Sequence, residues 1–189
     1  MIKKTLAIIA GGKSSRMNYR DKALIKYNNK TFIDNIIDSA CDFKEIIIIS
    51  NKIESYKGFK VFKDIYKECG PLGGIHSALL NAKYDKVLCI ACDMPLIRKE
   101  TLNLIGKVYD DYEVVVPKID NRLQPLCSIY SKQLIPKIEE ALISGENKLQ
   151  KFILERNYKI IDDIKYENLN SKEFSNINNK EDLKILEEK

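Results

Sequence analysis

Short, uninterrupted apolar runs alternate along this chain with longer stretches in which apolar and polar residues mix. The clearest runs are residues 6–10, 46–49, 87–92 and 114–116. A charge-free run of this length is typical of a strand that is covered on both faces, as in a parallel sheet. We therefore predict four core strands here, the last of them stopped by Pro117, with weaker strands at 59–62 and 160–161 and an extended segment at 122–130.

The mixed stretches have the spacing of amphipathic helices. Phe32, Ile33 and Ile36 share one helical face, and Thr31 with Asp34 has the spacing of a capping box that marks the start of this helix. Similar patterns predict helices after the glycines at 73–74, around 102–108, at 134–142, at 149–154 and, capped by Asn179 and Asp182, at the end of the chain. Strands alternating with such helices predict an α/β fold, a three-layer α/β/α arrangement with a mostly parallel central sheet.

Composition narrows the class of protein. The length of 189 residues suits a single domain, 1–189. No apolar run is long enough to span a bilayer and no signal-peptide pattern opens the chain, so we expect a cytoplasmic protein without membrane association. The net charge of +5 comes from lysines scattered among acids, which argues against nucleic acid as a partner. Five cysteines, an odd number, favour reduced thiols, and we interpret the Cys89–Cys92 pair as core packing.

The loop that follows the first apolar run carries the first candidate chemistry. Gly11 and Gly12 allow a sharp turn that brings backbone N–H groups against an anion, and Arg16 and Lys22 supply positive charge. This loop differs from the usual P-loop, because Ala7 stands where that motif requires glycine. Alone, the two glycines would fit an ordinary turn between a strand and a helix better than a nucleotide-binding loop.

Two carboxylates follow later strands. Asp64 comes just after the strand at 59–62, and Asp93 lies in a Cys-Asp-Met-Pro sequence that ends the strand at 87–92. The carboxyl ends of parallel strands form one edge of a sheet, and ligands bind along that edge. We therefore expect both acids to lie beside the glycine loop, with a turn or capping role as the alternative for each.

Five segments taken together resemble one family. They are AGGKSSRMNYRDKAL at 10–24, GPLGGI at 70–75, CDMP at 92–95, RLQPL at 122–126 and FSNINNKEDL at 174–183. In this order they resemble the molybdenum cofactor guanylyltransferases, which are nucleotidyltransferases with a Rossmann-like fold. The resemblance implies transfer of GMP from GTP to molybdenum-molybdopterin, release of pyrophosphate, formation of molybdopterin guanine dinucleotide and a requirement for Mg²⁺.

The resemblance also implies roles for individual residues. Those on the nucleotide side, roughly residues 1–117, are Ile9, Ala10, Gly11 and Gly12 through their backbone, Asp64 toward the guanine nucleoside, Lys22 on the phosphates, and Asp93 on GTP and magnesium. Arg16, Lys22 and Asp93 would be the catalytic groups. On the molybdopterin side, roughly residues 118–189, the matching residues are Arg122, Asn176 and Asn178. The chain departs from the family pattern at Asn18, which replaces a glycine, and at Asn179-Lys180, which replace Thr-Pro.

Other functions stay open at this stage. The same loop design serves cytidylyl transfer to molybdopterin and nucleotidyl transfer to sugar phosphates or phospholactate, and preference for a nucleotide would separate these. A non-catalytic GTP-binding adaptor in cofactor delivery would bind nucleotide without releasing pyrophosphate. The resemblance makes molybdenum-cofactor insertion proteins and apo-molybdoenzymes the candidate protein partners, with GTP and molybdenum-molybdopterin as small-molecule substrates.

Overall fold

The computed structural model describes residues 1–11, 22–108, 111–162, 169–177 and 182. The strands of this part are β1 (Ile2–Ile9), β2 (Lys26–Tyr27), β3 (Lys30–Thr31), β4 (Phe43–Ile49), β5 (Lys60–Phe62), β6 (Lys86–Ala91), β7 (Val114–Ile119), β8 (Arg122–Leu123), β9 (Cys127–Ser131) and β10 (Tyr158–Asp162). The α-helices are α1 (Phe32–Ser39), α2 (Gly70–Asn81), α3 (Lys99–Gly106), α4 (Ile135–Ile143) and α5 (Leu149–Leu154). Short 3₁₀ helices are η2 (Lys22–Leu24), η3 (Lys132–Leu134) and η4 (Ser171–Phe174).

One sheet of eight strands organises the molecule. Its order is β10-β7-β9-β6-β1-β4-β5, with β8 paired to β7, while β2 and β3 form a separate hairpin. The neighbours β6, β1, β4 and β5 all pair in parallel, as do β7 and β10. Strand β9 runs antiparallel to both β6 and β7, and β8 antiparallel to β7. The prediction of an α/β fold with a mostly parallel central sheet is confirmed.

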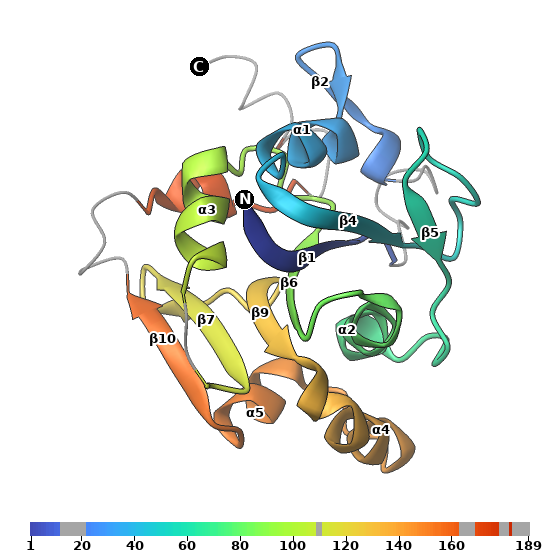
Figure 1. Ribbon diagram of the computed structural model, residues 1–189, viewed down its shortest axis with the longest axis vertical. Coiled ribbons are helices and arrows are strands. Elements are labelled where there is room, and N and C mark those ends of the chain that lie inside the picture. Colours follow the sequence, from blue (N-terminus) through green and yellow to red (C-terminus); the bar gives the residue numbers. More distant parts are fainter. Residues whose placement is uncertain (12–21, 109–110, 163–168, 178–181, 183–189) are drawn as a thin grey trace.

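The sheet separates two apolar cores. Alternate residues of a strand point to opposite faces, so Leu6 and Ile8 pack into the core that α1 and α3 cover. Ala7 and Ile9 pack into the other core, which α2, α4 and α5 cover. Figure 1 shows α1 and α3 above the sheet and α2, α4 and α5 below it, which is the predicted three-layer arrangement.

Helix α1 begins where the capping pattern predicted. Thr31 is its N-cap, and the Thr31 hydroxyl accepts a hydrogen bond of 3.2 Å from the Asp34 N–H. Helix α2, in contrast, begins earlier than predicted, at Gly70, so Gly73 and Gly74 lie inside it. Close packing explains glycine within this helix: a Cβ atom on Gly73 would lie 2.7 Å from the Tyr66 carbonyl oxygen, and one on Gly74 would lie 2.9 Å from Cγ2 of Ile9.

Two other expectations change in the second half of the sheet. Strand β7 continues through Pro117 to Ile119: it pairs with β10 from Val114 to Lys118, with β9 at Val114 and Val115, and with β8 at Lys118 and Ile119. A proline is tolerated where no central ladder bond is needed from its nitrogen. The extended segment at 122–130 is two strands, β8 and β9, separated by residues 124–126.

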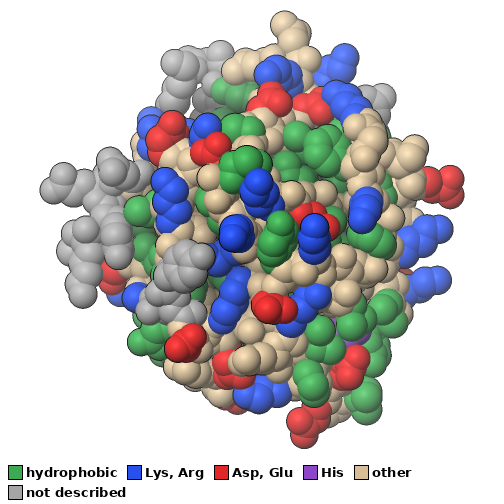
Figure 2. All heavy atoms as spheres, in the orientation of Figure 1, with side chains coloured by type: hydrophobic (Ala, Val, Ile, Leu, Met, Phe, Trp, Pro, Cys, Tyr) green, Lys and Arg blue, Asp and Glu red, His purple; other side chains and the backbone are tan. Residues whose placement is uncertain are grey.

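The described helices include none that is long and apolar enough to cross a membrane. On the face seen in Figure 2, Lys and Arg side chains are interspersed with Asp and Glu. Such mixing favours a solvated surface over a track for nucleic acid. The helix predicted at the end of the chain lies, except for Asp182, outside the described residues.

Candidate active site

A cavity of about 590 Å³ opens at the edge of the sheet where its parallel strands end, which we call the carboxyl edge. Each parallel strand of the central group delivers residues to it. The lining includes Ile9, Ala10 and Gly11 after β1, Asn51 after β4, Asp64 after β5, Asp93 after β6, Leu126 before the reversed strand β9, and also Lys22, Gly74 and Asn176. The sheet order fixes the sequence of these groups along the edge: Leu126, Asp93, Gly11, Asn51, Asp64.

Two glycines without side chains, Gly11 and Gly74, are part of the cavity lining. A Cβ atom on Gly11 would lie 3.3 Å from Oδ2 of Asp64, tighter than almost all real contacts of a Cβ. Gly74, in the facing helix α2, leaves even less room, because a Cβ there would lie 2.9 Å from Cγ2 of Ile9. The two glycines therefore let the end of β1, the start of α2 and the Asp64 carboxylate approach one another, and they expose backbone to whatever occupies the cavity.

Asp93 lies in the turn after β6 with its carboxylate largely removed from water. Oδ2 of Asp93 is 3.5 Å from Nζ of Lys22, and the two side chains are 17% and 20% exposed. Oδ1 is buried and has no hydrogen-bond partner in the described part of the chain. Burial raises the pKa of the Asp93 carboxyl above its ordinary value although Lys22 acts in the opposite direction. This carboxylate has the capacity to bind a further positive group.

Asp64 is held by a neighbour that the sequence did not single out. Nδ2 of Asn51 donates to Oδ2 of Asp64 at 3.0 Å, and the Asp64 N–H donates to Oδ1 of Asn51 at the same distance. Oδ1 of Asp64 is buried without a hydrogen-bond partner among the described residues. Burial raises the pKa of Asp64, and the bond from Asn51 partly offsets this. Asn51 is the second residue after β4, a position that does not by itself distinguish it from other loop residues.

The cavity brings together most of the residues that the sequence indicated. Seven of them line it: Ile9, Ala10, Gly11, Lys22, Asp64, Asp93 and Asn176. Arg122 is exposed in β8 and is not part of this lining. Gly12, Arg16 and Asn178 lie outside the described residues, as does Asn18. The roles assigned to all these residues stay predictions.

Two residue types with reactive potential have structural positions instead. All five cysteines are free thiols, and Cys89 and Cys92 are buried, which agrees with their interpretation as core residues. His76 is buried in α2, where Nε2 lies 3.0 Å from Oε1 of Glu139 and the ring meets Tyr66 edge to face. His76 therefore links α2 to α4.

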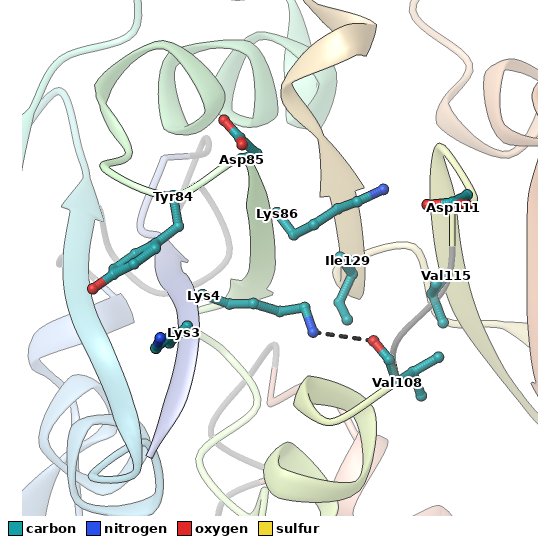
Figure 3. A pocket seen from close by; sticks show the side chains of 9 residues that line it. All are labelled: Lys3, Lys4, Tyr84, Asp85, Lys86, Val108, Asp111, Val115 and Ile129. Carbon is teal, nitrogen blue, oxygen red and sulfur yellow. Dashed lines mark hydrogen bonds between the residues drawn. The ribbon is translucent and has the colours of Figure 1, made fainter.

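A second hollow, of about 690 Å³, lies at the opposite edge of the sheet (Figure 3). The buried ammonium group of Lys4 donates there to the carbonyl oxygens of Gly106, at 2.7 Å, and Val108, at 3.0 Å. Lys86 donates to the Tyr112 carbonyl at 2.5 Å. Burial lowers the pKa of both lysines. Because these ammonium groups bind backbone at the C-terminal end of α3 and just beyond it, we interpret this hollow as structural and the cavity at the carboxyl edge as the candidate active site.

The chain is similar in sequence and in fold to known proteins. The chain is 52% identical over 168 residues to a probable molybdenum cofactor guanylyltransferase of Clostridium perfringens strain 13, covering 88% of this chain and 85% of the relative. It is 32% identical over 160 residues to the molybdenum cofactor guanylyltransferase of Vibrio campbellii, covering 82% of each chain. The crystal structure of molybdopterin-guanine dinucleotide biosynthesis protein A from Archaeoglobus fulgidus superposes with a TM-score of 0.82 at 23% identity, over 97% of each chain, and so shares the fold.

A family model, the MobA-like NTP transferase domain, matches residues 6–160. This range contains the glycine loop, Asp64 and Asp93, and it ends within β10. The resemblance found in the sequence is therefore confirmed over most of the chain, and the chain belongs to the family of MobA-like NTP transferases.

Proposed function

We propose that this protein transfers GMP from GTP to the terminal phosphate of molybdenum-molybdopterin, with release of pyrophosphate and formation of molybdopterin guanine dinucleotide. The observation that carries the proposal is the convergence of bare backbone at Gly11, the ammonium of Lys22 and the buried carboxylate of Asp93 in one cavity. The names of the relatives from Clostridium perfringens and Vibrio campbellii support the choice of substrates.

The reaction asks the protein mainly for charge and position. An oxygen of the acceptor phosphate forms a bond to the α-phosphorus of GTP, and the bond between that phosphorus and the oxygen of pyrophosphate breaks. The acceptor oxygen is already ionised near neutral pH, so no general base is required. Lys22 offsets the negative charge of the phosphates, and the backbone at residues 9–11 holds them in line for attack.

The residues present fit a magnesium ion that the substrate helps to bind. Oδ1 of Asp93 is a buried anionic oxygen without a hydrogen-bond partner among the described residues, the donor type that Mg²⁺ prefers. Within the described residues no group of three or more His, Cys, Asp or Glu side chains could hold a metal ion. Mg²⁺ does not require such a group, because it commonly binds one or two carboxylates and takes waters and substrate phosphates as its other ligands. We propose Asp93 as its protein ligand. When bound, the ion would offset charge on the phosphates.

The nucleoside fits the other end of the cavity. Asp64 lies there with one buried oxygen that has no hydrogen-bond partner in the described residues, and Asn51 fixes the orientation of its carboxylate. Guanine offers N–H donors, and a buried acceptor left unpaired is costly, so such a site can discriminate between bases. The proposal therefore includes selection of GTP over CTP through Asp64 and backbone carbonyls.

The direct test is incubation of the purified protein with GTP, MgCl₂ and molybdenum-molybdopterin, scored for pyrophosphate and for the dinucleotide product. CTP in place of GTP, a sugar phosphate in place of molybdopterin, and EDTA in place of magnesium are the controls. Dinucleotide and pyrophosphate formed in the reaction with GTP, MgCl₂ and molybdenum-molybdopterin, and in none of the controls, support the proposal. Nucleotide binding without pyrophosphate would refute it in favour of an adaptor. The proposal also includes action in the cytoplasm and delivery of the product to insertion proteins or apo-molybdoenzymes.

A further inference from the structure

Residues 169–177 are attached to the start of α3 by one buried acid, Glu173, which is only 4% exposed. Oε1 of Glu173 accepts from Nε of Arg98 at 2.6 Å and lies 2.5 Å from the second guanidinium nitrogen, NH2. Oε2 accepts from the hydroxyl of Thr101 at 2.6 Å and from the Arg98 N–H at 3.2 Å. Both oxygens of this carboxylate are thus bound by groups at the start of α3.

A second attachment joins the same segment to Asp93. The Ile177 N–H donates to the Asp93 carbonyl oxygen at 2.9 Å, and the side chains of Phe174 and Ile177 are buried. Only two residues, Ser175 and Asn176, separate these buried side chains, and both are exposed. Asn176 lines the cavity beside Asp93. The two attachments therefore fix where Asn176 lies relative to Asp93.

The order of groups along the carboxyl edge indicates what Asn176 faces. Asn51 and Asp64 follow β4 and β5, on one side of Gly11, and Asp93 follows β6 on the other side. Asn176 is at the Asp93 end because the N–H of its neighbour Ile177 donates to the Asp93 carbonyl oxygen, and Leu126 is there because its carbonyl oxygen accepts from the Ala91 N–H at the end of β6. With the nucleoside at the Asp64 end, the acceptor substrate occupies the end that Asn176 lines.

We propose that Glu173 is a positioning residue for the acceptor substrate, acting through Asn176. This inference rests on the proposed function. A buried carboxylate is costly to desolvate even when it is fully paired, and its pairing geometry fixes position more narrowly than an apolar contact does. Glu173 holds residues 169–177 in the position in which Asn176 lines the cavity beside Asp93, the proposed magnesium ligand. A displacement of about 1 Å at such a position can reduce turnover by about a hundredfold.

The experiment measures KM for molybdopterin and KM for GTP separately in the full-length protein. Glu173→Gln removes the charge but keeps the shape of the side chain, and we expect the acceptor KM to rise about tenfold while the GTP KM stays within about twofold. Glu146→Gln is the matched control, because Glu146 pairs with Lys151 at 2.6 Å in the turn between α4 and α5. This control should behave as the wild type.

If Glu173→Gln folds poorly, two conservative substitutions of Thr101 test the same role. Thr101→Val loses the hydroxyl that binds Glu173, whereas Thr101→Ser retains it, so only the valine variant should raise the acceptor KM. Hydrogen exchange at the Ile177 amide should accelerate in the same variants. Equal increases in both KM values, or lower thermal stability with both KM values unchanged, would overturn the positioning role. A wild-type protein that forms no dinucleotide would instead refute the proposed function.

Discussion

Asp93 carries a charge that folding removes from water, and this has a consequence for stability as well as for turnover. Its side chain is 17% exposed, Nζ of Lys22 is 3.5 Å from Oδ2, and burial raises the pKa of the carboxyl above 3.8. A raised pKa means that the charged form of Asp93 is less favourable in the folded protein than in the unfolded chain, even with Lys22 present. Replacing Asp93 with asparagine, which is neutral and nearly the same shape, should therefore stabilise the fold while it removes the proposed magnesium ligand.

Burial and the pairing with Lys22 act on the Asp93 charge in opposite directions, and burial dominates. Each unit by which the pKa of a group is raised corresponds to about 1.4 kcal/mol of unfavourable free energy for the charged form. A partly exposed ion pair such as the one with Lys22 contributes about 0.2–1 kcal/mol in the other direction, and the raised pKa already includes it. We expect Asp93→Asn to add about 1 kcal/mol to the free energy of unfolding near pH 7, which is about 2–4 °C in Tm for a chain of this size.

The pH dependence of the stability difference between Asp93→Asn and the wild type tests the direction of this effect. Because the folded pKa lies above the unfolded one, the unfavourable contribution is fully present above the folded pKa, and it is lost as the pH falls toward the ordinary value of 3.8. The difference in Tm between variant and wild type should therefore be largest near pH 7 and shrink at pH 4. Both proteins are compared in EDTA, because a bound cation would stabilise only the wild type.

Thermal and urea unfolding measure the stability of Asp93→Asn, and pyrophosphate release measures its activity, which should fall about a hundredfold or more. Asp38→Asn is the control for stability, since Asp38 is exposed in the last turn of α1 and pairs only on the surface with Lys30. A variant that is several degrees less stable than the wild type at pH 7 would refute the reasoning. It would indicate that the Asp93 carboxylate serves the turn after β6, the alternative that the sequence left open.

Three further substitutions probe the rest of the fold and site. Gly73→Ala should lower the free energy of unfolding by about 1–3 kcal/mol in urea titrations, because its Cβ would lie 2.7 Å from a backbone oxygen; a stable variant would contradict this packing. Lys4→Met removes the ammonium that binds two carbonyls and should cost about 1–3 kcal/mol without changing the turnover of folded protein; reduced turnover would show that the opposite edge matters for activity. Asn51→Ala frees Asp64 and should raise the GTP KM about tenfold with the acceptor KM unchanged; a rise in the acceptor KM alone would contradict our placement of the nucleoside.

The sequence predicted those features that depend on neighbours along the chain. Buried parallel strands leave uninterrupted apolar runs, as at 46–49 in β4, and the N-cap of α1 needs only Thr31 and the N–H three residues later. The positions of Gly11, Asp64 and Asp93 followed from the same logic, because a residue just after a parallel strand must lie at the carboxyl edge. Their assembly into one cavity was therefore predictable without knowledge of any side-chain contact.

Features that depend on contacts between distant segments were not predictable in this way. The length of β7 past Pro117 depends on which strand pairs with it there, and the start of α2 depends on how closely Tyr66 and Ile9 approach its glycines. Asn51 looked like an ordinary loop residue until its two bonds to Asp64 were seen. Nothing local distinguishes these residues from others of the same type.

The acceptor side of the cavity shows the same limit most clearly. Glu173 is separated by 75 residues from Arg98 and by 72 from Thr101, so no spacing rule connects it to either. Its sequence neighbours Lys172 and Phe174 fit a surface turn as well as a buried attachment. Yet burial of its carboxylate at the start of α3 and the Ile177 bond to Asp93 together set the place of Asn176. The part of the cavity that we propose for the nucleotide is thus formed by the ends of the strands themselves, whereas the part proposed for the acceptor also includes Asn176, from a separate segment that is attached to the start of α3 and to Asp93. Substitutions at Glu173 and at Asn51 should consequently affect different substrates, because Asn51 itself lines the cavity beside Asp64, whereas Glu173 acts from outside the cavity through the segment that carries Asn176.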